Sequence, residues 1–416
     1  MSTVKIYPSQ LNGTVTAPPS KSDVHRAVIC AALSGGVCRL APVALSNDIR
    51  ATIGCVEALG AKTSLSGDVL TVDGTNIFTE KTAVLNCLES GSTMRFFIPV
   101  AAAGGVSAEF IGCGSLLSRP VGLFADILPR AGVNVETGGT LPLKTNGKLK
   151  SGTFEVAGNI SSQYITGLLF ALPLLDGDSR IVLTTPLQSA GYTDMTTACM
   201  RAFGVEAERT DYGWFIKGGQ RYAVRDYRTE GDWSQAAFFM AGGALSGDVT
   251  VSGVYNDSAQ GDKEIAALLE RFGAEVERGG DFVRVRKAPL RSIEIDARQI
   301  PDLVPVLSTV ACFAQGDTVI SGAERLRIKE SDRLKTTAAL LNSLGGSVEE
   351  KPDGLVIHGT GLVGGCAEGA NDHRIVMSAA VAALLSENAV TVTDRESTNK
   401  SYPAFFEDYK KLGGAV

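Results

Sequence analysis

Four short segments of the chain place cations beside hydroxyl-bearing and acidic side chains. They are Pro19–Arg26, Ser118–Pro120, Arg327–Arg333 and Asn371–Arg374. Arginine captures a planar carboxylate through two parallel hydrogen bonds, whereas lysine acts on phosphate as a point charge. The net charge of −6 gives the chain no general attraction for anions, so any anion site must be a local cluster. The four segments predict such a cluster, for small molecules that carry carboxylate and phosphate groups.

Several of these cations stand where long apolar helices are expected to begin. A Ser or an Asp, both favoured helix N-caps, precedes an apolar stretch every 70 or 71 residues, at Ser20, Ser90, Ser161, Asp232, Asp302 and Asp372. The free N–H groups of a helix start attract anions, whereas a cation there opposes the helix dipole. The unfavourable positions of Lys21, Arg26 and Arg374 therefore favour a role in binding over a role in capping.

A second repeat runs in phase with the first. Glycines that are expected to end helices in the left-handed conformation recur at intervals of 68 to 72 residues, at Gly60, Gly132, Gly204, Gly273, Gly345 and Gly413. Each copy of about 70 residues then contains a buried helix, a strand, an amphipathic helix and a hairpin-like pair of strands. Six copies fill the chain, and this mixture of helices and strands indicates an α/β (α+β) protein.

The domain organisation follows from the ends of the repeats. The sixth copy stops at Val416, where its hairpin should begin, and the segment Val4–Pro18 has strand character with no helix before it. We expect this segment to complete the sixth copy. Residues 1–18 and 229–416 then form a discontinuous domain of three repeats, residues 19–228 form a similar inserted domain, and the active site lies in the cleft between them. A six-unit solenoid is the weaker alternative, because solenoid repeats of this length would be unusual.

Composition excludes several functional classes. The negative net charge argues against binding to nucleic acid or to an anionic membrane. The N-terminus lacks the apolar region of a signal peptide, and the longest apolar helical run, residues 375–385, is too short to span a bilayer, so a cytoplasmic location is expected. Eight scattered cysteines are expected to be reduced core residues, and three histidines form no ligand set, so no metal is expected.

Together with Glu89–Arg95, the four cationic segments resemble the 5-enolpyruvylshikimate-3-phosphate (EPSP) synthase family over the whole chain. That family shares its six-unit architecture, an inverse α/β barrel in each domain, with UDP-N-acetylglucosamine enolpyruvyl transferase. The resemblance implies transfer of the enolpyruvyl group of phosphoenolpyruvate to the 5-hydroxyl of 3-phosphoshikimate, with release of phosphate, in the shikimate pathway of aromatic amino acid biosynthesis. It implies no cofactor, and small-molecule substrates bound by a cytoplasmic monomer.

The resemblance also assigns residues to roles. The general base is Asp302, the general acid is Glu330, and Lys21 shares in the proton transfers. Phosphoenolpyruvate is bound by Lys21, Gly91, Arg119, Gln163, Arg333, Arg374 and Lys400. The residues that bind 3-phosphoshikimate are Lys21, Ser22, Arg26, Ser161, Ser162, Gln163, Ser189, Tyr192, Asp302 and Lys329.

Two residues depart from the pattern of many relatives, which carry Asn at the positions of Glu89 and Arg325. Both changes affect the expected fine contacts to substrate, and neither removes a proposed catalytic group. The resemblance further implies inhibition by glyphosate, an anion that occupies the phosphoenolpyruvate site. Gly91 leaves room for this ligand because it has no side chain.

Two other functions compete with this interpretation. One is enolpyruvyl transfer to UDP-N-acetylglucosamine, whose enzymes carry a reactive cysteine a few residues before an Arg-Pro pair; here Cys113 lies six residues before Arg119. That sister family lacks the Arg327–Arg333 segment and usually has Asn at the position of Ser22, so we expect Cys113 to be incidental. The other is a non-catalytic anion-binding scaffold, which should have lost Lys21, Asp302 or Glu330.

Overall fold

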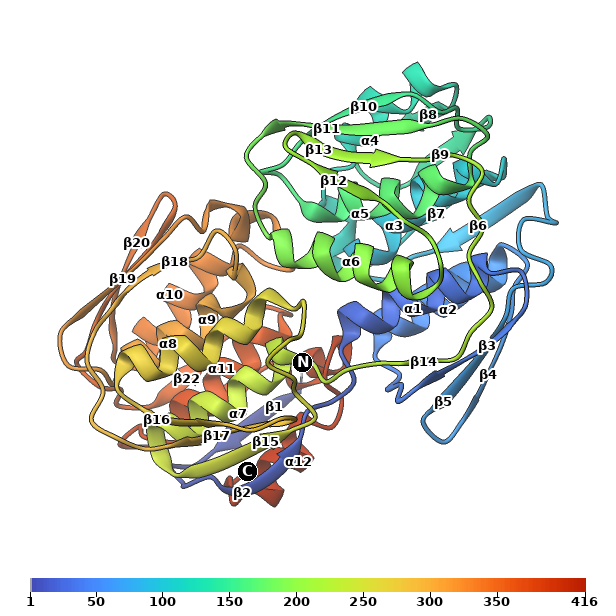
Figure 1. Cartoon of the computed structure of the whole chain (residues 1–416). Helices are drawn as coiled ribbons and strands as arrows, with labels where there is room; N and C mark the ends of the chain where they lie inside the picture. Colours follow the sequence, from blue (N-terminus) through green and yellow to red (C-terminus); the bar gives the residue numbers. More distant parts are fainter. Residues whose placement is uncertain (1) are drawn as a thin grey trace. The chain divides into compact units, whose positions relative to one another are not determined.

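The computed structural model describes residues 2–416, and these form two compact units (Figure 1). Unit 1 combines the N-terminal segment up to Pro18 with Glu230–Val416, and unit 2 is Pro19–Thr229. Each unit has its own hydrophobic core. The sequence predicts the second boundary one residue earlier, between residues 228 and 229.

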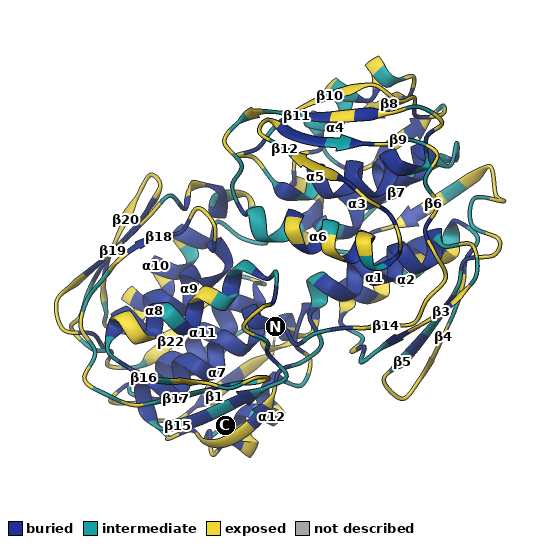
Figure 2. Ribbon diagram, viewed as in Figure 1, coloured by how far each residue is buried: buried dark blue, intermediate teal, exposed yellow. Residues whose placement is uncertain are grey.

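Six helices lie at the centres of the two cores, and Figure 2 shows them buried on nearly all sides. They are α1 (Lys21–Leu33), α3 (Gly91–Ala103) and α5 (Ser162–Ala171) in unit 2, and α7 (Trp233–Ser246), α9 (Val304–Ala311) and α11 (His373–Ala383) in unit 1. Their Ala-, Val- and Leu-rich sequences present apolar surface in every direction, as a buried helix requires.

Five of the six predicted N-caps are confirmed. The side chains of Ser20, Ser90, Ser161, Asp232 and Asp372 each accept a hydrogen bond from a main-chain N–H of the helix that follows. The prediction for Asp302 is wrong. Asp302 lies inside a 3₁₀ turn, η5 (Pro301–Leu303), and α9 begins without a side-chain cap. The carboxylate of Asp302 is therefore available for other contacts.

A second set of helices follows the strand of each repeat. They are α2 (Asn47–Ala58), α4 (Gly122–Ile127), α6 (Ala190–Ala202), α8 (Ile265–Phe272), α10 (Arg333–Ser343) and α12 (Phe405–Lys411). All six glycines predicted to end this set have φ between +78° and +115°, in the region that favours glycine. The six-fold repeat predicted from the sequence is thus confirmed at the ends of the helices.

Each repeat contributes one small sheet with the same pairing. The first two strands in spatial order are parallel, and the following strands are antiparallel. In unit 2 the sheets are β14 (Tyr227–Arg228), β3 (Val37–Ala41), β5 (Val69–Asp73), β4 (Lys62–Ser66); β6 (Thr82–Asn86), β7 (Ser107–Ile111), β9 (Leu143–Asn146), β8 (Asn134–Thr137); and β10 (Thr153–Ala157), β11 (Ser179–Thr185), β13 (Gly213–Ile216), β12 (Glu208–Thr210).

The sheets of unit 1 repeat this arrangement around their helices (Figure 1). They are β2 (Asn12–Thr16), β15 (Asp248–Ser252), β17 (Phe282–Arg286), β16 (Glu275–Arg278); β18 (Glu294–Asp296), β19 (Asp317–Ser321), β21 (Gly354–His358), β20 (Ser347–Lys351); and β22 (Gly365–Ala367), β23 (Val390–Thr393), β1 (Thr3–Ile6).

The N-terminal segment serves two repeats rather than one. Strand β1 pairs antiparallel with β23, and Tyr7 bridges to Ala415, so this part completes the sixth repeat as predicted. Strand β2 instead pairs in parallel with β15 of the fourth repeat. The parallel edge position in the first repeat is occupied by β14, from the end of unit 2. The strand before α1 thus pairs in the fourth repeat and the strand before α7 pairs in the first, while each strand stays within its own unit.

The cysteines only partly match expectation. Six of the eight are buried, but Cys113 and Cys366 are exposed, so those two are not core residues. Within residues 2–416, no helix is both long and apolar enough to cross a membrane.

Candidate active site

In unit 1, five of the predicted site residues lie at or just before the starts of three helices, α9, α10 and α11. Asp302 lies in η5, Lys329 and Glu330 follow the 3₁₀ helix η6 (Glu324–Ile328), Arg333 is the first residue of α10, and Arg374 lies in the first turn of α11. The pattern of buried helix starts recognised in the sequence therefore brings these side chains into one cluster.

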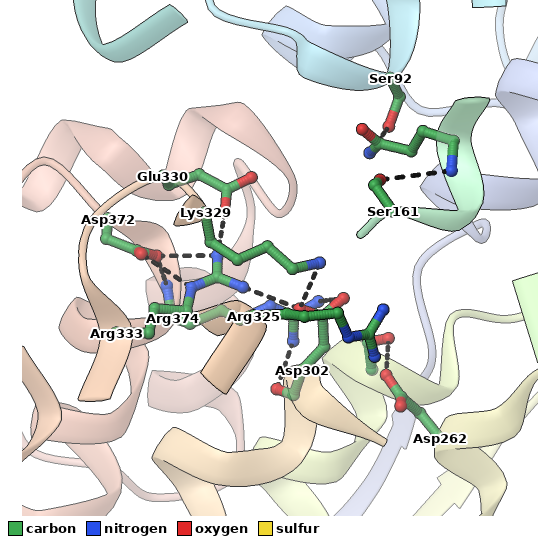
Figure 3. Close-up of polar contacts among 12 residues, drawn as sticks. Ser92, Ser161, Asp262, Asp302, Arg325, Lys329, Glu330, Arg333, Asp372 and Arg374 are labelled. Carbon is green, nitrogen blue, oxygen red and sulfur yellow. Dashed lines mark hydrogen bonds and ion pairs between the residues drawn. The ribbon is translucent and has the colours of Figure 1, made fainter. Parts of the chain in front are cut away.

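Arg333 is the centre of this cluster (Figure 3). Its Nη1 lies 2.8 Å from Asp302 Oδ1, its Nη2 lies 2.6 Å from Glu330 Oε2, and its Nε lies 2.8 Å from Asp372 Oδ2. The side chain is 1% exposed. Burial alone would lower the pKa of Arg333, but the carboxylates of Asp372, Glu330 and Asp302 outweigh it and raise the pKa. The guanidinium is therefore a fixed positive charge at the centre of three carboxylates.

Asp302 is surrounded by cations. Besides Arg333, Lys329 Nζ lies 3.6 Å from its Oδ1 and Arg374 Nη2 lies 3.4 Å from its Oδ2. Burial alone would raise the pKa of Asp302, but the charges of Arg374, Lys329 and Arg333 outweigh it and hold the pKa well below its usual value. Burial lowers the pKa of Lys329 despite the nearby charge of Asp302. Asp302 is thus an ionised carboxylate whose proton affinity depends on three neighbouring cations.

Asp372 has a second role that the sequence did not reveal. It caps α11 through the Arg374 N–H, and it also accepts hydrogen bonds from Arg333 Nε and Nη2 and from Ser331 Oγ. It is fully buried, and the charge of Arg333 outweighs the effect of burial and lowers its pKa. The capping pattern predicted the first contact, whereas Arg333 lies 39 residues away in the chain.

Asp262 was also missed. It lies in the 3₁₀ helix η4 (Gly261–Glu264), is buried, and accepts a short hydrogen bond from Ser234 Oγ in the first turn of α7. Burial and the negative charge of Asp302 raise the pKa of Asp262 to about 7, although Arg374 acts in the opposite direction. The position of Asp262 in the sequence, far from the cationic segments, did not indicate that it lies near Asp302 and Arg374.

Lys400 joins the neighbourhood of α11. It ends the 3₁₀ helix η7 (Arg395–Lys400), is buried, and its Nζ donates to the carbonyl of Asn371 at 2.7 Å. Asn371 directly precedes the cap of α11, so the positive charge of Lys400 lies next to the start of that helix.

In unit 2 the helix α1 carries three predicted residues. Lys21 Nζ lies 2.8 Å from Asp48 Oδ2 of α2. Arg26 is buried, and its guanidinium donates to Thr196 Oγ1 at 2.9 Å and to the carbonyls of Ser22 and Tyr192 at 2.5 and 2.8 Å. Arg26 therefore joins the first turns of α1 and α6. Burial lowers its pKa.

A second group in unit 2 joins α3 and α5. Gln163 Nε2 donates to Ser92 Oγ at 2.8 Å (Ser92 is labelled in Figure 3). Arg95 Nη1 donates to Gln163 Oε1 at 2.6 Å. A Cβ atom on Gly91 would lie 2.5 Å from Arg119 Nη1 and 3.1 Å from Arg95 Nη1. Gly91 thus allows two guanidinium groups to approach its main chain. Arg95 was missed as a site residue, although it ends the Glu89–Arg95 motif.

The remaining predicted residues of unit 2 also stand at helix starts. Ser161 caps α5, Ser162 is its first residue, and Ser189 precedes α6 in the left-handed conformation with φ of 55°. Tyr192 lies in the first turn of α6 and accepts from Arg26 through its carbonyl. The predicted residues of unit 2 therefore gather at the starts of α1, α3, α5 and α6, apart from Arg119, which follows the 3₁₀ helix η1 (Gly114–Ser118).

Comparison with known proteins gives one consistent result. A family model described as EPSP synthase (3-phosphoshikimate 1-carboxyvinyltransferase) matches residues 6–409. Proteins named 3-phosphoshikimate 1-carboxyvinyltransferase from Clostridium beijerinckii and Clostridium novyi are 45% and 42% identical, over 100% of this chain and 98% of theirs. A solved EPSP synthase from Acinetobacter baumannii superposes with a TM-score of 0.84 at 25% identity, covering 99% of this chain and 98% of that one.

An enolpyruvyl transferase from Streptomyces tendae, NikO, shares the fold. Its TM-score is 0.79 at 20% identity, covering 99% of this chain and 97% of that one.

Proposed function

Because the chain belongs to the EPSP synthase (3-phosphoshikimate 1-carboxyvinyltransferase) family, we propose that it transfers the enolpyruvyl group of phosphoenolpyruvate to the 5-hydroxyl of 3-phosphoshikimate. The observation that carries the proposal is the arrangement around Arg333. One guanidinium contacts two carboxylates, Asp302 and Glu330, and Arg374 and Lys329 flank the first of them. In this buried cluster the cations can bind an anionic substrate, and the two carboxylates can accept and donate protons beside it.

The reaction needs one group that accepts a proton and one that donates a proton. The 5-hydroxyl oxygen forms a bond to C2 of phosphoenolpyruvate and loses its proton to a base, while C3 gains a proton from an acid. In the tetrahedral ketal that results, the bond from C2 to the phosphate oxygen breaks and C3 returns a proton. Asp302 is the base and Glu330 is the acid that later takes the proton back, with Lys21 sharing in the transfers.

The basicity of Asp302 depends on what occupies the cluster. With Arg374, Lys329 and Arg333 around it, the low pKa of Asp302 makes it a weak base. A carboxylate and a phosphate bound to the same cations bring negative charge close to Asp302 and raise its pKa. Asp302 therefore becomes an effective base only when substrate is bound, which couples proton abstraction to binding.

The two units supply different cations to the two substrates. In unit 1, Arg333, Arg374 and Lys400 bind phosphoenolpyruvate, and Lys329 binds 3-phosphoshikimate. In unit 2, the residues that bind 3-phosphoshikimate are Ser22, Arg26, Ser161, Ser162, Ser189 and Tyr192. Gly91 and Arg119 bind phosphoenolpyruvate, while Lys21 and Gln163 contact both substrates. Most of these residues lie at helix starts, where main-chain N–H groups add to the attraction for anions. The exceptions are Arg119, Lys329 and Lys400, which lie at the ends of 3₁₀ helices.

Release of inorganic phosphate tests the proposal. The purified chain is mixed with phosphoenolpyruvate and either 3-phosphoshikimate or UDP-N-acetylglucosamine, and phosphate is measured over time. We expect release only with 3-phosphoshikimate. Release only with the nucleotide sugar would assign the chain to the alternative acceptor, and release with neither would indicate a binding protein.

Two variants test the assigned roles. Asp302→Asn and Glu330→Gln each remove an ionisable group at nearly constant volume, and we expect kcat to fall by about 10²- to 10⁴-fold. Glu349→Gln is the matched control, because Glu349 is an exposed carboxylate of β20 that pairs with Lys351. Unchanged turnover in Asp302→Asn would remove Asp302 as the base.

A further inference from the structure

A chain of buried hydrogen bonds connects three helices of unit 2. His25 Nδ1 of α1 lies 2.6 Å from Thr52 Oγ1 of α2, which lies 2.8 Å from Thr93 Oγ1 of α3. Thr93 Oγ1 in turn donates to Ser90 Oγ, the cap of α3, at 2.8 Å. All four residues are at most 1% exposed. This series of hydrogen bonds therefore runs from helix α1, which carries Lys21 and Ser22, to Ser90, the residue directly before Gly91.

The direction of every bond in this chain follows from counting hydrogens. Thr93 has one hydroxyl hydrogen, which it gives to Ser90, so Thr52 must donate to Thr93. The single hydroxyl hydrogen of Thr52 is then used, so Thr52 can only accept from His25. His25 must therefore carry its proton on Nδ1. Ser90 Oγ accepts both from the hydroxyl and from the main-chain N–H of Thr93, which fixes the first turn of α3.

The surroundings of His25 keep it neutral. Burial and the positive charges of Lys21 and Arg26 hold its pKa well below the usual value. The edge of the Phe96 ring also packs against the imidazole, with ring centroids 6.2 Å apart. Among residues 2–416 no partner accepts or donates at His25 Nε2, so this nitrogen adds nothing to the chain. The contribution of His25 is thus one donor, Nδ1–H, at one position.

We propose that His25 is a positioning residue for the phosphoenolpyruvate-binding turn at Ser90–Gly91, which it orients through Thr52 and Thr93. This inference rests on the proposed function. One turn earlier on the same two helices, Lys21 contacts Asp48. The helices α1 and α2 are therefore joined at successive turns, first by Lys21, which binds substrate, and then by His25, which orients the Ser90–Gly91 turn. Loss of the Nδ1–H donor leaves Thr52 free to rotate, and the hydroxyl of Thr93 and the cap of α3 lose their fixed direction.

Two amide substitutions at His25 distinguish a role for its Nδ1–H donor from a role in packing alone. The amide of His25→Asn can place a donor near the position of Nδ1, whereas the longer side chain of His25→Gln places it near the position of Nε2. We expect His25→Asn to keep the KM for phosphoenolpyruvate within about twofold of the parent. We expect His25→Gln to raise that KM by about threefold to tenfold, the equivalent of one lost hydrogen bond, with kcat and the KM for 3-phosphoshikimate little changed.

Thr52→Val repeats the test at the next hydrogen bond of the series, without altering His25. It replaces the hydroxyl with a methyl group of similar size and should raise the KM for phosphoenolpyruvate to the same extent as His25→Gln. The matched control is Tyr222→Phe, which removes another buried hydrogen bond of unit 2, from Tyr222 Oη to the carbonyl of Phe170. This control should lower stability without changing either KM.

A spectroscopic measurement is independent of catalysis. Nitrogen NMR of the whole protein at pH 7 to 8, with three histidines to assign, should show His25 protonated on Nδ1 alone. Protonation on Nε2, or equal KM values for the Asn and Gln variants in an active parent, overturns the inference. An inactive parent with the Nδ1–H form intact would instead contradict the proposed function and leave the hydrogen-bond chain supported.

Discussion

The two units hold their cations in different ways. In unit 1, Arg333 and Arg374 contact carboxylates, and their charges lower the pKa values of Asp302 and Asp372, whereas the nearby Asp262 has a raised pKa. In unit 2, Arg26 and Arg95 donate to hydroxyl, amide and main-chain carbonyl oxygens, none of which titrates. Unit 1 is therefore suited to exchange protons beside a bound anion, whereas the described contacts of Arg26 and Arg95 in unit 2 are to neutral oxygens, and Lys21 pairs with the carboxylate of Asp48. Five predictions test this difference.

The largest effect is expected from removal of the central cation of unit 1. Arg333→Met leaves Asp302, Glu330 and Asp372 without their common partner in a buried environment. We expect the free energy of unfolding to fall by about 3–5 kcal/mol, together with loss of activity. Chemical denaturation followed by circular dichroism measures the loss. Arg298→Met, which removes an exposed partner of Asp296, should change stability by at most about 1 kcal/mol. Equal stability of Arg333→Met and the parent would refute the central role of this ion cluster.

Removal of a cation from unit 2 should affect activity more than stability. In Lys21→Met the carboxylate of Asp48 loses its contact with Lys21 Nζ. We expect kcat/KM to fall by about tenfold to a hundredfold, because a charged hydrogen-bond donor to substrate is lost. The loss of stability should be smaller than in Arg333→Met. An unfolded Lys21→Met variant would show that the cation of unit 2 matters as much for stability as the central cation of unit 1.

Asp262 should make unit 1 less stable as the pH rises. The folded protein holds a proton on Asp262 up to pH about 7, whereas an unfolded Asp loses its proton near pH about 3.9. The folded state therefore binds more protons between these values, and its stability falls with rising pH by at most about 1.4 kcal/mol per pH unit. Asp262→Asn should remove this slope, as measured by denaturation between pH 4 and 8. Parallel curves for the variant and the parent would contradict the raised pKa.

In unit 2, His25 should change the stability with pH in the opposite direction, so that stability falls as the pH falls. Its folded pKa lies well below 6.5, so the unfolded state binds more protons below that pH. Stability is therefore present in full above pH about 6.5 and is progressively lost as the pH falls. We expect the stability of His25→Asn, relative to the parent, to improve below that pH and to stay constant above it. A constant difference over the whole range would mean that His25 has the same pKa in the folded and the unfolded protein.

The smallest effect is expected at Gly91. An Ala side chain there would displace the guanidinium groups of Arg119 and Arg95, which are the ends of flexible side chains. We expect the fold to be unchanged and the KM for phosphoenolpyruvate to rise by about twofold to tenfold, because Arg119 must leave its preferred position. Inhibition by glyphosate should weaken more, as measured by competition against phosphoenolpyruvate. Equal sensitivity of the two proteins would refute the steric argument.

Local features of the molecule could be predicted from the sequence because they depend on a few neighbouring residues. The left-handed glycines such as Gly60 and Gly273 and the caps such as Ser90 and Asp372 were all identified from their spacing. The same pattern placed Lys21 and Arg374 at helix starts. It was wrong at Asp302, because the 3₁₀ turn that begins at Pro301 removes that carboxylate from the capping position.

Only the tertiary structure decided how the site residues act on one another. Arg333 meets Asp302 and Asp372 across 31 and 39 residues of chain, and His25 meets Thr52 across 27. The pairing of β2 with β15 and of β14 with β3 also had no local signal. A cap or a turn depends on the conformation of adjacent residues, whereas these contacts depend on which repeats pack together. The pKa values of Asp302, Asp262 and His25 follow from those contacts, since burial and neighbouring charges set them.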